Sequence, residues 1–193
     1  MISVAIVDDH PAMQIGLRAA LRAEPGLVPV GSAATPEQIY ALLYRTRPDV
    51  VLLDYHLPGT DGLTVCRRLK SDVLSPGVLL YSAFADESLL MPAIVAGADG
   101  VINKSAPPRE LYDAVRVVAG GGRSLPAPPR ALLRAACEQI DAEDQPILGM
   151  LMDGTPLADI AATLRLRPGD LDGRLMRMLD RLRVPARAYA APP

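Results

Sequence analysis

The sequence predicts a doubly wound α/β domain with a parallel sheet, followed by a small all-α domain. Three observations carry this prediction. Short runs of Val, Ile and Leu without polar alternation recur through the first 120 residues, as expected of strands buried on both faces. Segments of helical period lie between these runs, so that strand and helix alternate in five units. After about residue 130 no strand-like run is found.

The elements of the first domain follow from this alternation. We expect strands at 2–7, 27–31, 49–53, 77–81 and 99–102. We expect helices at 11–23, 36–46, 61–71, 86–96 and 107–119. Three of these helices begin near a proline, which the first helical turn tolerates: Pro11, Pro36, and Pro107 or Pro108.

The second domain is separated from the first by a linker. Residues 120–130 have the sequence GGGRSLPAPPR, which is typical of a linker. Helices are expected at 129–139, 142–152, 156–164 and 168–182, and Asp141 is expected to cap the second of them. The predicted division is a first domain at 1–119, the linker at 120–130, a helical domain at 131–185 and a flexible tail at 186–193.

The composition narrows the class of protein. The 193 residues carry a formal net charge of −2, so no strong overall field points to nucleic acid or acidic lipid. Cys66 and Cys137 are too few for a disulfide scaffold and fit a reducing compartment. No apolar run reaches the roughly 18 residues of a membrane span, and residues 1–7 lack the pattern of a signal peptide. We therefore expect a cytoplasmic protein without membrane contact.

Polar side chains follow four of the five predicted strands. In chain order they are Asp8 and Asp9, Asp54, Ser82, which the apolar Ala83 follows, and Lys104. Taken singly, each residue could instead have an ordinary structural role in a helix cap or a loop. Because the carboxyl ends of parallel strands meet at one edge, where such sheets bind ligands, we expect the set to converge there.

Phosphoryl transfer to a carboxylate requires such a set of side chains. Clustered carboxylates favour a hard divalent cation, and Mg²⁺ binds one or two carboxylates while keeping positions for water and phosphoryl oxygens. Asp54 can attack phosphorus as the nucleophile. Lys104 can supply a positive charge, and Ser82 a hydrogen bond, to the phosphoryl oxygens.

Four stretches of the first domain match a known family. They are IVDDHP (6–11), VVLLDYHLPGTDGL (50–63), LLYSA (79–83) and GADGVINKSAPPREL (97–111). Through them the first 120 residues resemble the receiver domain of bacterial two-component response regulators. The resemblance implies a flavodoxin-like (βα)₅ fold, a phosphorelay function and a sensor histidine kinase as the phosphodonor.

The resemblance also assigns roles to the polar set. Asp54 is the implied phosphoacceptor, and Asp9 and Asp54 are the implied direct Mg²⁺ ligands. The backbone carbonyl of His56 is a further implied ligand, and Asp8 acts through water. The implied phosphate-binding and switch residues are Ser82, Ala83 and Lys104. One position departs from the family, because Val101 stands where many receivers have the switch aromatic.

The two histidines are interpreted without a metal role for their side chains. An imidazole is a poor match to Mg²⁺, which prefers oxygen. His10 precedes Pro11 and is interpreted as part of a helix start.

Residues 140–184 resemble the LuxR-type (NarL-like) helix-turn-helix output domain. The apolar residues at the family's core positions are Ile140, Ile147, Leu148, Leu151, Gly154, Ile160, Ala161, Leu164, Leu166, Leu171, Leu175, Leu179, Leu182 and Val184. The resemblance implies a scaffold helix near 156–164, a turn at 165–167 and a recognition helix at 168–182. Such a helix enters the major groove of DNA.

The positions that contact DNA in the family are degenerate here. Asp170 and Asp172 stand at the start of the recognition helix, where they would repel phosphates, and Pro146 interrupts the first helix. Residues 131–193 hold eight arginines and nine acidic residues, a net charge of −1. The candidate DNA contacts are Arg167, Arg174, Arg177 and Arg181.

These observations predict a transcription regulator that is phosphorylated on Asp54 with Mg²⁺ and binds promoter DNA, with dimerisation on phosphorylation. One alternative is a signalling adaptor whose helix-turn-helix domain contacts protein instead of DNA. A second is a phosphatase with an aspartate nucleophile, which needs a carboxylate two residues further on, where His56 stands. We therefore expect no metabolic enzyme, and only slow autophosphorylation from a phosphodonor and autodephosphorylation.

Overall fold

The protein divides into two compact units, and each unit is built from two separate stretches of the chain. The computed structural model describes residues 1–72, 75–83 and 85–183. One unit is Met1–Ala85 with Ala98–Leu125, and the other is Asp86–Gly97 with the chain from Pro126 onward. The predicted tail at 186–193 and the end of the predicted helical domain lie outside the described residues.

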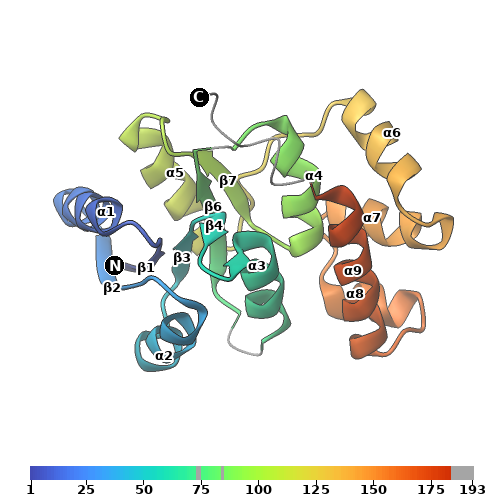
Figure 1. Cartoon of the computed structure of the whole chain (residues 1–193), viewed down its shortest axis with the longest axis horizontal. Helices are drawn as coiled ribbons and strands as arrows, with labels where there is room; N and C mark the ends of the chain where they lie inside the picture. The colour runs from blue at the N-terminus through green and yellow to red at the C-terminus, as the bar shows by residue number, and fades with distance from the viewer. Residues whose placement is uncertain (73–74, 84, 184–193) are drawn as a thin grey trace. The chain divides into compact units, whose positions relative to one another are not determined.

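A parallel sheet of five strands forms the centre of the first unit (Figure 1). The strands are β1 (Ile2–Val7), β2 (Leu27–Ala33), β3 (Val50–Leu53), β6 (Gly77–Ser82) and β7 (Gly100–Asn103). Their order is β2-β1-β3-β6-β7. The predicted doubly wound α/β fold is thus confirmed. In such an order, the crevice at the carboxyl ends of β1 and β3 is the place where ligands bind.

Four helices of this unit cover the two faces of the sheet. They are α1 (Pro11–Ala23), α2 (Pro36–Thr46), α3 (Gly62–Ser71) and α5 (Pro108–Ala119). Helices α1 and α5 lie on one face, and α2 and α3 on the other (Figure 1). Under α1 and α5, alternate strand residues such as Val4, Ile6 and Leu52 form a buried apolar core with Leu21 and Val115. Three of the four helices begin at a predicted proline.

A short hairpin between β3 and α3 is absent from the sequence prediction. It consists of β4 (His56–Leu57) and β5 (Thr60–Asp61), paired antiparallel. Gly59 forms its turn with a φ of 73°, in the left-handed region that favours glycine. The hairpin follows Asp54 almost directly and so fixes the path of the chain beside the predicted phosphoacceptor.

The second unit is helical. Its elements are α4 (Glu87–Ala96), α6 (Arg130–Gln139), η1 (Ala142–Asp144), α7 (Gln145–Met152), α8 (Leu157–Thr163) and α9 (Pro168–Leu182). Residues 89–96 of α4 are buried, and this helix packs against α6, α7 and α9. Helices α8 and α9 form the predicted helix-turn-helix, and Ile160, Leu171 and Leu175 are buried in its core.

Two details of this unit differ from the sequence prediction. The predicted helix at 142–152 is a 3₁₀ turn followed by α7, because Pro146 has no backbone N–H and is accommodated in the first turn of α7. The predicted cap by Asp141 is wrong, since its side chain makes no capping hydrogen bond. The Asp141 carboxylate instead lies 2.6 Å from Nη1 of Arg181 on α9.

Among the described residues, no helix is both long and apolar enough to cross a membrane.

Candidate phosphoacceptor site

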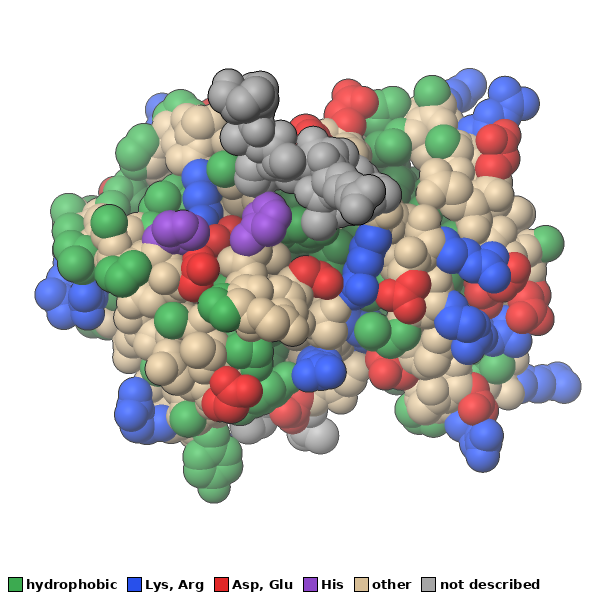
Figure 2. Space-filling view, viewed as in Figure 1, with side chains coloured by type: hydrophobic (Ala, Val, Ile, Leu, Met, Phe, Trp, Pro, Cys, Tyr) green, Lys and Arg blue, Asp and Glu red, His purple; other side chains and the backbone are tan. Residues whose placement is uncertain are grey.

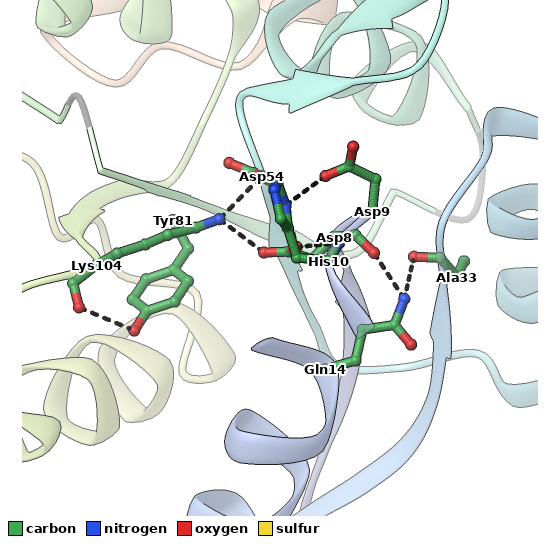
Figure 3. Close-up of polar contacts among 8 residues, drawn as sticks. All are labelled: Asp8, Asp9, His10, Gln14, Ala33, Asp54, Tyr81 and Lys104. Carbon is green, nitrogen blue, oxygen red and sulfur yellow. Dashed lines mark hydrogen bonds and ion pairs between the residues drawn. The ribbon is translucent and has the colours of Figure 1, made fainter. Parts of the chain in front are cut away.

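The carboxyl edge of the sheet brings the predicted polar set together, and Figure 3 shows its charged members Asp8, Asp9, Asp54 and Lys104. Asp8 directly follows β1, Asp54 follows β3, Ser82 ends β6 and Lys104 follows β7. The strands are in register, with Val7 opposite Leu53 and Leu53 opposite Leu80. Asp8 and Asp54 are therefore one residue beyond the paired ends of β1 and β3, and Ser82 is two residues beyond Leu80, so all three lie at the carboxyl edge of the sheet.

Lys104 is the positive centre of this pocket. Its Nζ atom lies 2.7 Å from Asp8 Oδ2 and 2.8 Å from Asp54 Oδ2. The Asp8 and Asp54 side chains are only 2% and 5% exposed, so their charges have little access to water. Burial acts to lower the pKa of Lys104, but hydrogen bonds to Asp54 and Asp8 outweigh it and leave that pKa raised. The lysine is therefore charged at neutral pH.

Asp8 is held rigidly by the first turn of α1. Its Oδ1 accepts a hydrogen bond of 2.8 Å from the backbone N–H of His10. The Nε2 group of Gln14 donates to the Asp8 backbone carbonyl at 2.6 Å. Sequence reasoning missed Gln14, because its position inside a helix gives no sign that its side chain reaches the end of β1.

Asp54 is positioned through its backbone. Its N–H donates to the Val7 carbonyl at 2.8 Å, which ties β3 to β1 at the pocket. Gly62, at the start of α3, lies so close that an added Cβ would be 2.3 Å from the Asp54 carbonyl oxygen. Sequence reasoning also missed this role. A glycine at a helix start can serve several purposes, and only the packing of α3 shows that Gly62 allows the close approach to the Asp54 backbone.

The ends of β6 and β7 are tied to each other. Lys104 N–H donates to the Ser82 carbonyl at 3.0 Å, and the Asn103 side chain donates to the Ala83 carbonyl at 3.2 Å. The Ser82 side chain is fully buried. Val101 on β7 is half-buried. Two hydrogen bonds therefore join the end of β6 to the loop that carries Lys104.

A cation fits among the acidic side chains of the pocket. One ligand atom from each of Asp8, Asp9, His10 and Asp54 lies within 4.8 Å of the others. Asp9 Oδ1 is buried, accepts no hydrogen bond from the part of the chain that the structure describes, and lies 2.7 Å from His10 Nδ1. A buried carboxylate oxygen without a donor is costly unless a cation neutralises it. Hard carboxylate oxygens are also the donors that Mg²⁺ prefers, so the residues present fit this ion.

His56 lies at the rim of the pocket on β4. Its side chain is exposed, and its ring packs edge-on against Tyr55 at a centroid distance of 4.8 Å. The role of its backbone carbonyl as a metal ligand stays a prediction.

Most of the candidate DNA contacts are paired with carboxylates of their own unit. Arg167 lies 2.7 Å from Asp170, and this hydrogen bond lowers the pKa of Asp170. Arg174 lies 3.2 Å from the buried Asp144. Arg181 pairs with Asp141, as described above. By contrast, Arg177 is exposed and has no ion pair within residues 1–72, 75–83 and 85–183. On the C-terminal helices, basic and acidic side chains are interspersed (Figure 2).

An open parallel sheet with acidic side chains and one buried lysine at its carboxyl edge defines a receiver-type α/β domain. The family of response regulator receiver domains matches residues 4–116 of this chain. The chain therefore belongs to the response regulator receiver family.

Three relatives extend the similarity beyond the receiver. The DNA-binding transcriptional activator DevR/DosR of Mycobacterium tuberculosis is 33% identical, over 99% of this chain and 93% of its own length. The nitrate/nitrite response regulator NarL of Escherichia coli is 26% identical, over 98% and 93%. A LuxR-family two-component response regulator from Aurantimonas, solved by crystallography, is 29% identical with a TM-score of 0.61, over 73% of this chain and 99% of the other. The chain is a response regulator of the NarL/LuxR type.

Proposed function

We propose that this response regulator is phosphorylated on Asp54 and controls transcription by binding promoter DNA through its helix-turn-helix. The observation that carries the proposal is the position of Lys104 Nζ between Asp8 and Asp54. Two buried carboxylates and one ammonium have a net negative charge, which a divalent cation can offset. The same ammonium can then contact phosphoryl oxygens.

The proposed reaction transfers a phosphoryl group from a phosphohistidine to Asp54. A carboxylate oxygen of Asp54 forms the new O–P bond while the N–P bond of the donor breaks and its electron pair stays on the imidazole. Lys104 then exchanges its contact with the Asp54 carboxylate for a contact with a phosphoryl oxygen. The Ser82 hydroxyl donates a hydrogen bond to another phosphoryl oxygen.

Mg²⁺ is the proposed cofactor of this step. Asp9 and Asp54 would bind it directly, together with the backbone carbonyl of His56, and Asp8 would act through water. When bound, Mg²⁺ neutralises charge on the transferred phosphoryl oxygens. The close grouping of the Asp8, Asp9 and Asp54 carboxylate oxygens supports this assignment.

The proposed phosphodonor is a sensor histidine kinase, and we propose that the protein is not a metabolic enzyme. A second acid or base carboxylate would be needed two residues after Asp54 for efficient turnover, and His56 stands there. The aspartyl phosphate is then lost only slowly, so that its lifetime sets the duration of the signal.

DNA binding is proposed from the α8–α9 helix-turn-helix and from the printed description of DevR/DosR as a DNA-binding activator. The ion pairs of Arg167, Arg174 and Arg181 reduce the positive charge that these side chains offer to phosphates. Arg177 is therefore the main proposed phosphate or base contact on α9. We expect binding that is weak, sensitive to salt and strengthened when phosphorylation produces a dimer.

Phosphorylation is tested with acetyl phosphate and Mg²⁺ on the full chain. We expect a mass increase of one phosphoryl group that Asp54→Asn abolishes. Asp49→Asn is the matched control, because Asp49 precedes β3 and hydrogen-bonds Ser3 at the other end of the strand. Phosphate uptake by Asp54→Asn at the wild-type rate would show that the acceptor is another residue.

Transcriptional control is tested by retardation of genomic DNA fragments at about 50 mM salt, where phosphate contacts are strong. We expect retardation that increases with beryllofluoride and is weaker in Arg177→Ala. The same samples are examined by light scattering for dimer formation. If no duplex is retarded in either state, the DNA-binding proposal fails, and the helical unit is to be tested for protein contacts instead.

A further inference from the structure

Tyr81 lies directly beside the charged group of the pocket. It is the next-to-last residue of β6 and is only 9% exposed. The Nζ atom of Lys104 lies over its ring, 6.0 Å from the ring centroid. Figure 3 shows the Lys104 side chain running alongside this ring toward Asp8 and Asp54. The tyrosine therefore borders the lysine side chain.

The same tyrosine also contacts the backbone of Lys104. Its hydroxyl donates a long hydrogen bond of 3.4 Å to the Lys104 carbonyl oxygen. Burial raises the pKa of Tyr81, so the hydroxyl keeps its proton at neutral pH and can donate. Because a hydrogen bond is weak at this length, we expect the ring to contribute more than the hydroxyl.

The strand pattern explains why this ring reaches the lysine. Tyr81 pairs with Ile102, and Ser82 with Asn103, in the parallel register of β6 and β7. Side chains alternate between the two faces of a sheet, so Tyr81 and Ser82 point in opposite directions. Tyr81 belongs to the apolar core under α1 and α5. Ser82 is the proposed hydrogen-bond donor to the phosphoryl group, while its neighbour packs against Lys104 from the other face.

Space for movement remains beside the ring. Tyr81 and Lys104 both line an open groove of about 380 Å³ between α1 and α5. Ala12, Gly16 and Ala20, which have small side chains or none, contribute to the α1 wall of this groove. The ring therefore has room to follow Lys104 when the ammonium changes its partner.

A ring beside a lysine acts on both the position and the charge of that lysine. The lysine stem is flexible, so contacts along its length decide where the ammonium lies. An ammonium over an aromatic face is attracted by the ring electrons, more strongly where water is excluded. Unlike the ion pair with Asp54, this attraction does not depend on a carboxylate that the proposed reaction consumes.

We propose that Tyr81 is a positioning residue for phosphoryl transfer, which holds the Lys104 ammonium while it exchanges the Asp54 carboxylate for a phosphoryl oxygen. The inference rests on the proposed function, because it concerns the lysine of the same pocket. Strand β7 (Gly100–Asn103) contains no aromatic residue, so the ring beside the lysine comes from β6 instead.

The first test follows the two lysines of the full chain by NMR, with an isotope label at Cε. An aromatic ring shifts the proton resonances of groups near its face, so the ε-methylene group of Lys104 reports the contact. Lys70→Arg assigns the signals, since Lys70 and Lys104 are the only lysines. We expect Tyr81→Leu to move the Lys104 signal and to leave that of Lys70 in place. An unchanged Lys104 signal in Tyr81→Leu would overturn the inference.

The second test measures the rate at which acetyl phosphate with Mg²⁺ phosphorylates Asp54. Tyr112→Leu is the matched control, because Tyr112 lines the same groove and its hydroxyl donates to the Ala20 carbonyl at 3.3 Å. We expect Tyr81→Leu to react about threefold or more slowly than Tyr112→Leu, as the loss of one cation–π contact implies. Tyr81→Phe is expected to restore most of the rate, because it keeps the ring. Equal rates for the two leucine variants would show that Tyr81 only fills the core.

A third measurement needs no variant that weakens the core. Wild type is labelled with fluorotyrosine, and Tyr81→Phe identifies the Tyr81 fluorine signal. We expect beryllofluoride with Mg²⁺ to move this signal, because it takes the place of the phosphoryl group on Asp54 and draws the ammonium toward it. Asp54→Asn is expected to give no response. A Tyr81 signal that stays in place while Asp54 binds beryllofluoride would contradict the proposal.

The two proposals fail in different ways. If wild type takes up phosphate on Asp54 but neither the rate nor the resonances depend on Tyr81, only the inference about Tyr81 is wrong. If wild type is not phosphorylated on Asp54, the proposed function fails and the positioning role falls with it. The lysine resonances then still show whether the Tyr81 ring packs against Lys104.

Discussion

The Nζ atom of Lys104 lies 2.8 Å from Oδ2 of Asp54, and both side chains are almost entirely buried. The same ammonium contacts Asp8 at 2.7 Å, so one positive charge offsets two buried carboxylates. Removing one partner of a buried pair leaves an uncompensated charge, which costs more than the pair itself contributes. Loss of Lys104 alone is therefore expected to destabilise the fold strongly.

This relationship gives a prediction for Lys104→Met. The variant is expected to lose about 3 kcal/mol in free energy of unfolding without metal, because Asp8 and Asp54 stay buried without their cation. Mg²⁺ is expected to restore much of the loss, since it supplies positive charge to the same carboxylates. Urea unfolding with and without Mg²⁺ measures both effects.

The other lysine of the chain is the control for this prediction. Lys70 is equally buried and pairs with Asp99 at 2.5 Å, away from the pocket. Lys70→Met is expected to be destabilised without gaining more from Mg²⁺ than wild type does. If Mg²⁺ stabilises the two variants equally, the metal does not bind beside Lys104.

The contact between Gly62 and the Asp54 backbone predicts a strong effect of one methyl group. In Gly62→Ala the new Cβ would meet the Asp54 carbonyl oxygen at 2.3 Å, and backbone cannot move aside cheaply. We expect a loss of about 1–3 kcal/mol in free energy of unfolding and slower phosphorylation by acetyl phosphate.

Gly16→Ala is the matched change, because Gly16 lies inside α1 with open space around its Cα. Alanine is the better helix former, so this variant is expected to gain up to about 1 kcal/mol. Thermal unfolding of both variants checks the pair. Equal stability of the two would mean that α3 does not pack against the acceptor loop as described.

Two arginines on α9, Arg174 and Arg177, are predicted to differ in their contribution to stability. Arg174 is paired with the buried Asp144, so Arg174→Ala is expected to lower the free energy of unfolding by about 1–3 kcal/mol. Arg177 is exposed, so Arg177→Ala is expected to change stability by less than about 0.5 kcal/mol. Chemical denaturation of the two variants separates these outcomes.

The same variants differ in the salt dependence of DNA binding. If Arg177 contacts a phosphate, its removal reduces the size of the negative slope of log association constant against log salt concentration by about one. The folded fraction of Arg174→Ala is expected to keep the wild-type slope. If the slope instead became shallower in Arg174→Ala and stayed unchanged in Arg177→Ala, the phosphate contact would belong to Arg174 and the prediction for Arg177 would be wrong.

The sequence predicts the elements well because their physical causes are local. The apolar runs of the strands need no information from distant residues, and Pro11 and Pro36 mark helix starts by their missing N–H groups. The convergence of Asp8, Asp54 and Lys104 also follows, because parallel strands end at a common edge. The hairpin β4–β5 escapes prediction because two-residue strands have no periodicity.

The remaining features depend on contacts between distant parts of the chain. Asp141 has the sequence pattern of a helix cap, but Arg181, forty residues further on, provides a stronger partner. Arg174 and Asp144 are thirty residues apart, so their pairing is likewise invisible in the sequence. His10 stands at the start of α1, as predicted, but the 2.7 Å contact of its Nδ1 with Asp9 depends on the folded loop.

The two cysteines are predicted to differ sharply in reactivity. Cys66 on α3 is fully buried, and burial raises the pKa of its thiol to about 12. Because the thiolate is the nucleophile, native Cys66 is expected to resist iodoacetamide at about pH 8, whereas the half-buried Cys137 reacts. Mass spectrometry of the native protein is expected to find one label, and none in Cys137→Ser. Labelling of native Cys137→Ser would mean that α3 opens readily.

The raised pKa of Cys66 also predicts a loss of stability in alkali. An unfolded thiol ionises near pH 8.5, whereas the folded one keeps its proton to about pH 12. The raised pKa therefore favours the unfolded state progressively as pH rises between these values, by at most about 1.4 kcal/mol per pH unit. Urea unfolding of wild type and Cys66→Ala at about pH 8 and pH 10 tests this. Wild type is expected to lose more stability than Cys66→Ala between the two pH values, since other alkaline titrations are common to both proteins. Equal losses would show that Cys66 ionises as easily in the folded state as in the unfolded one.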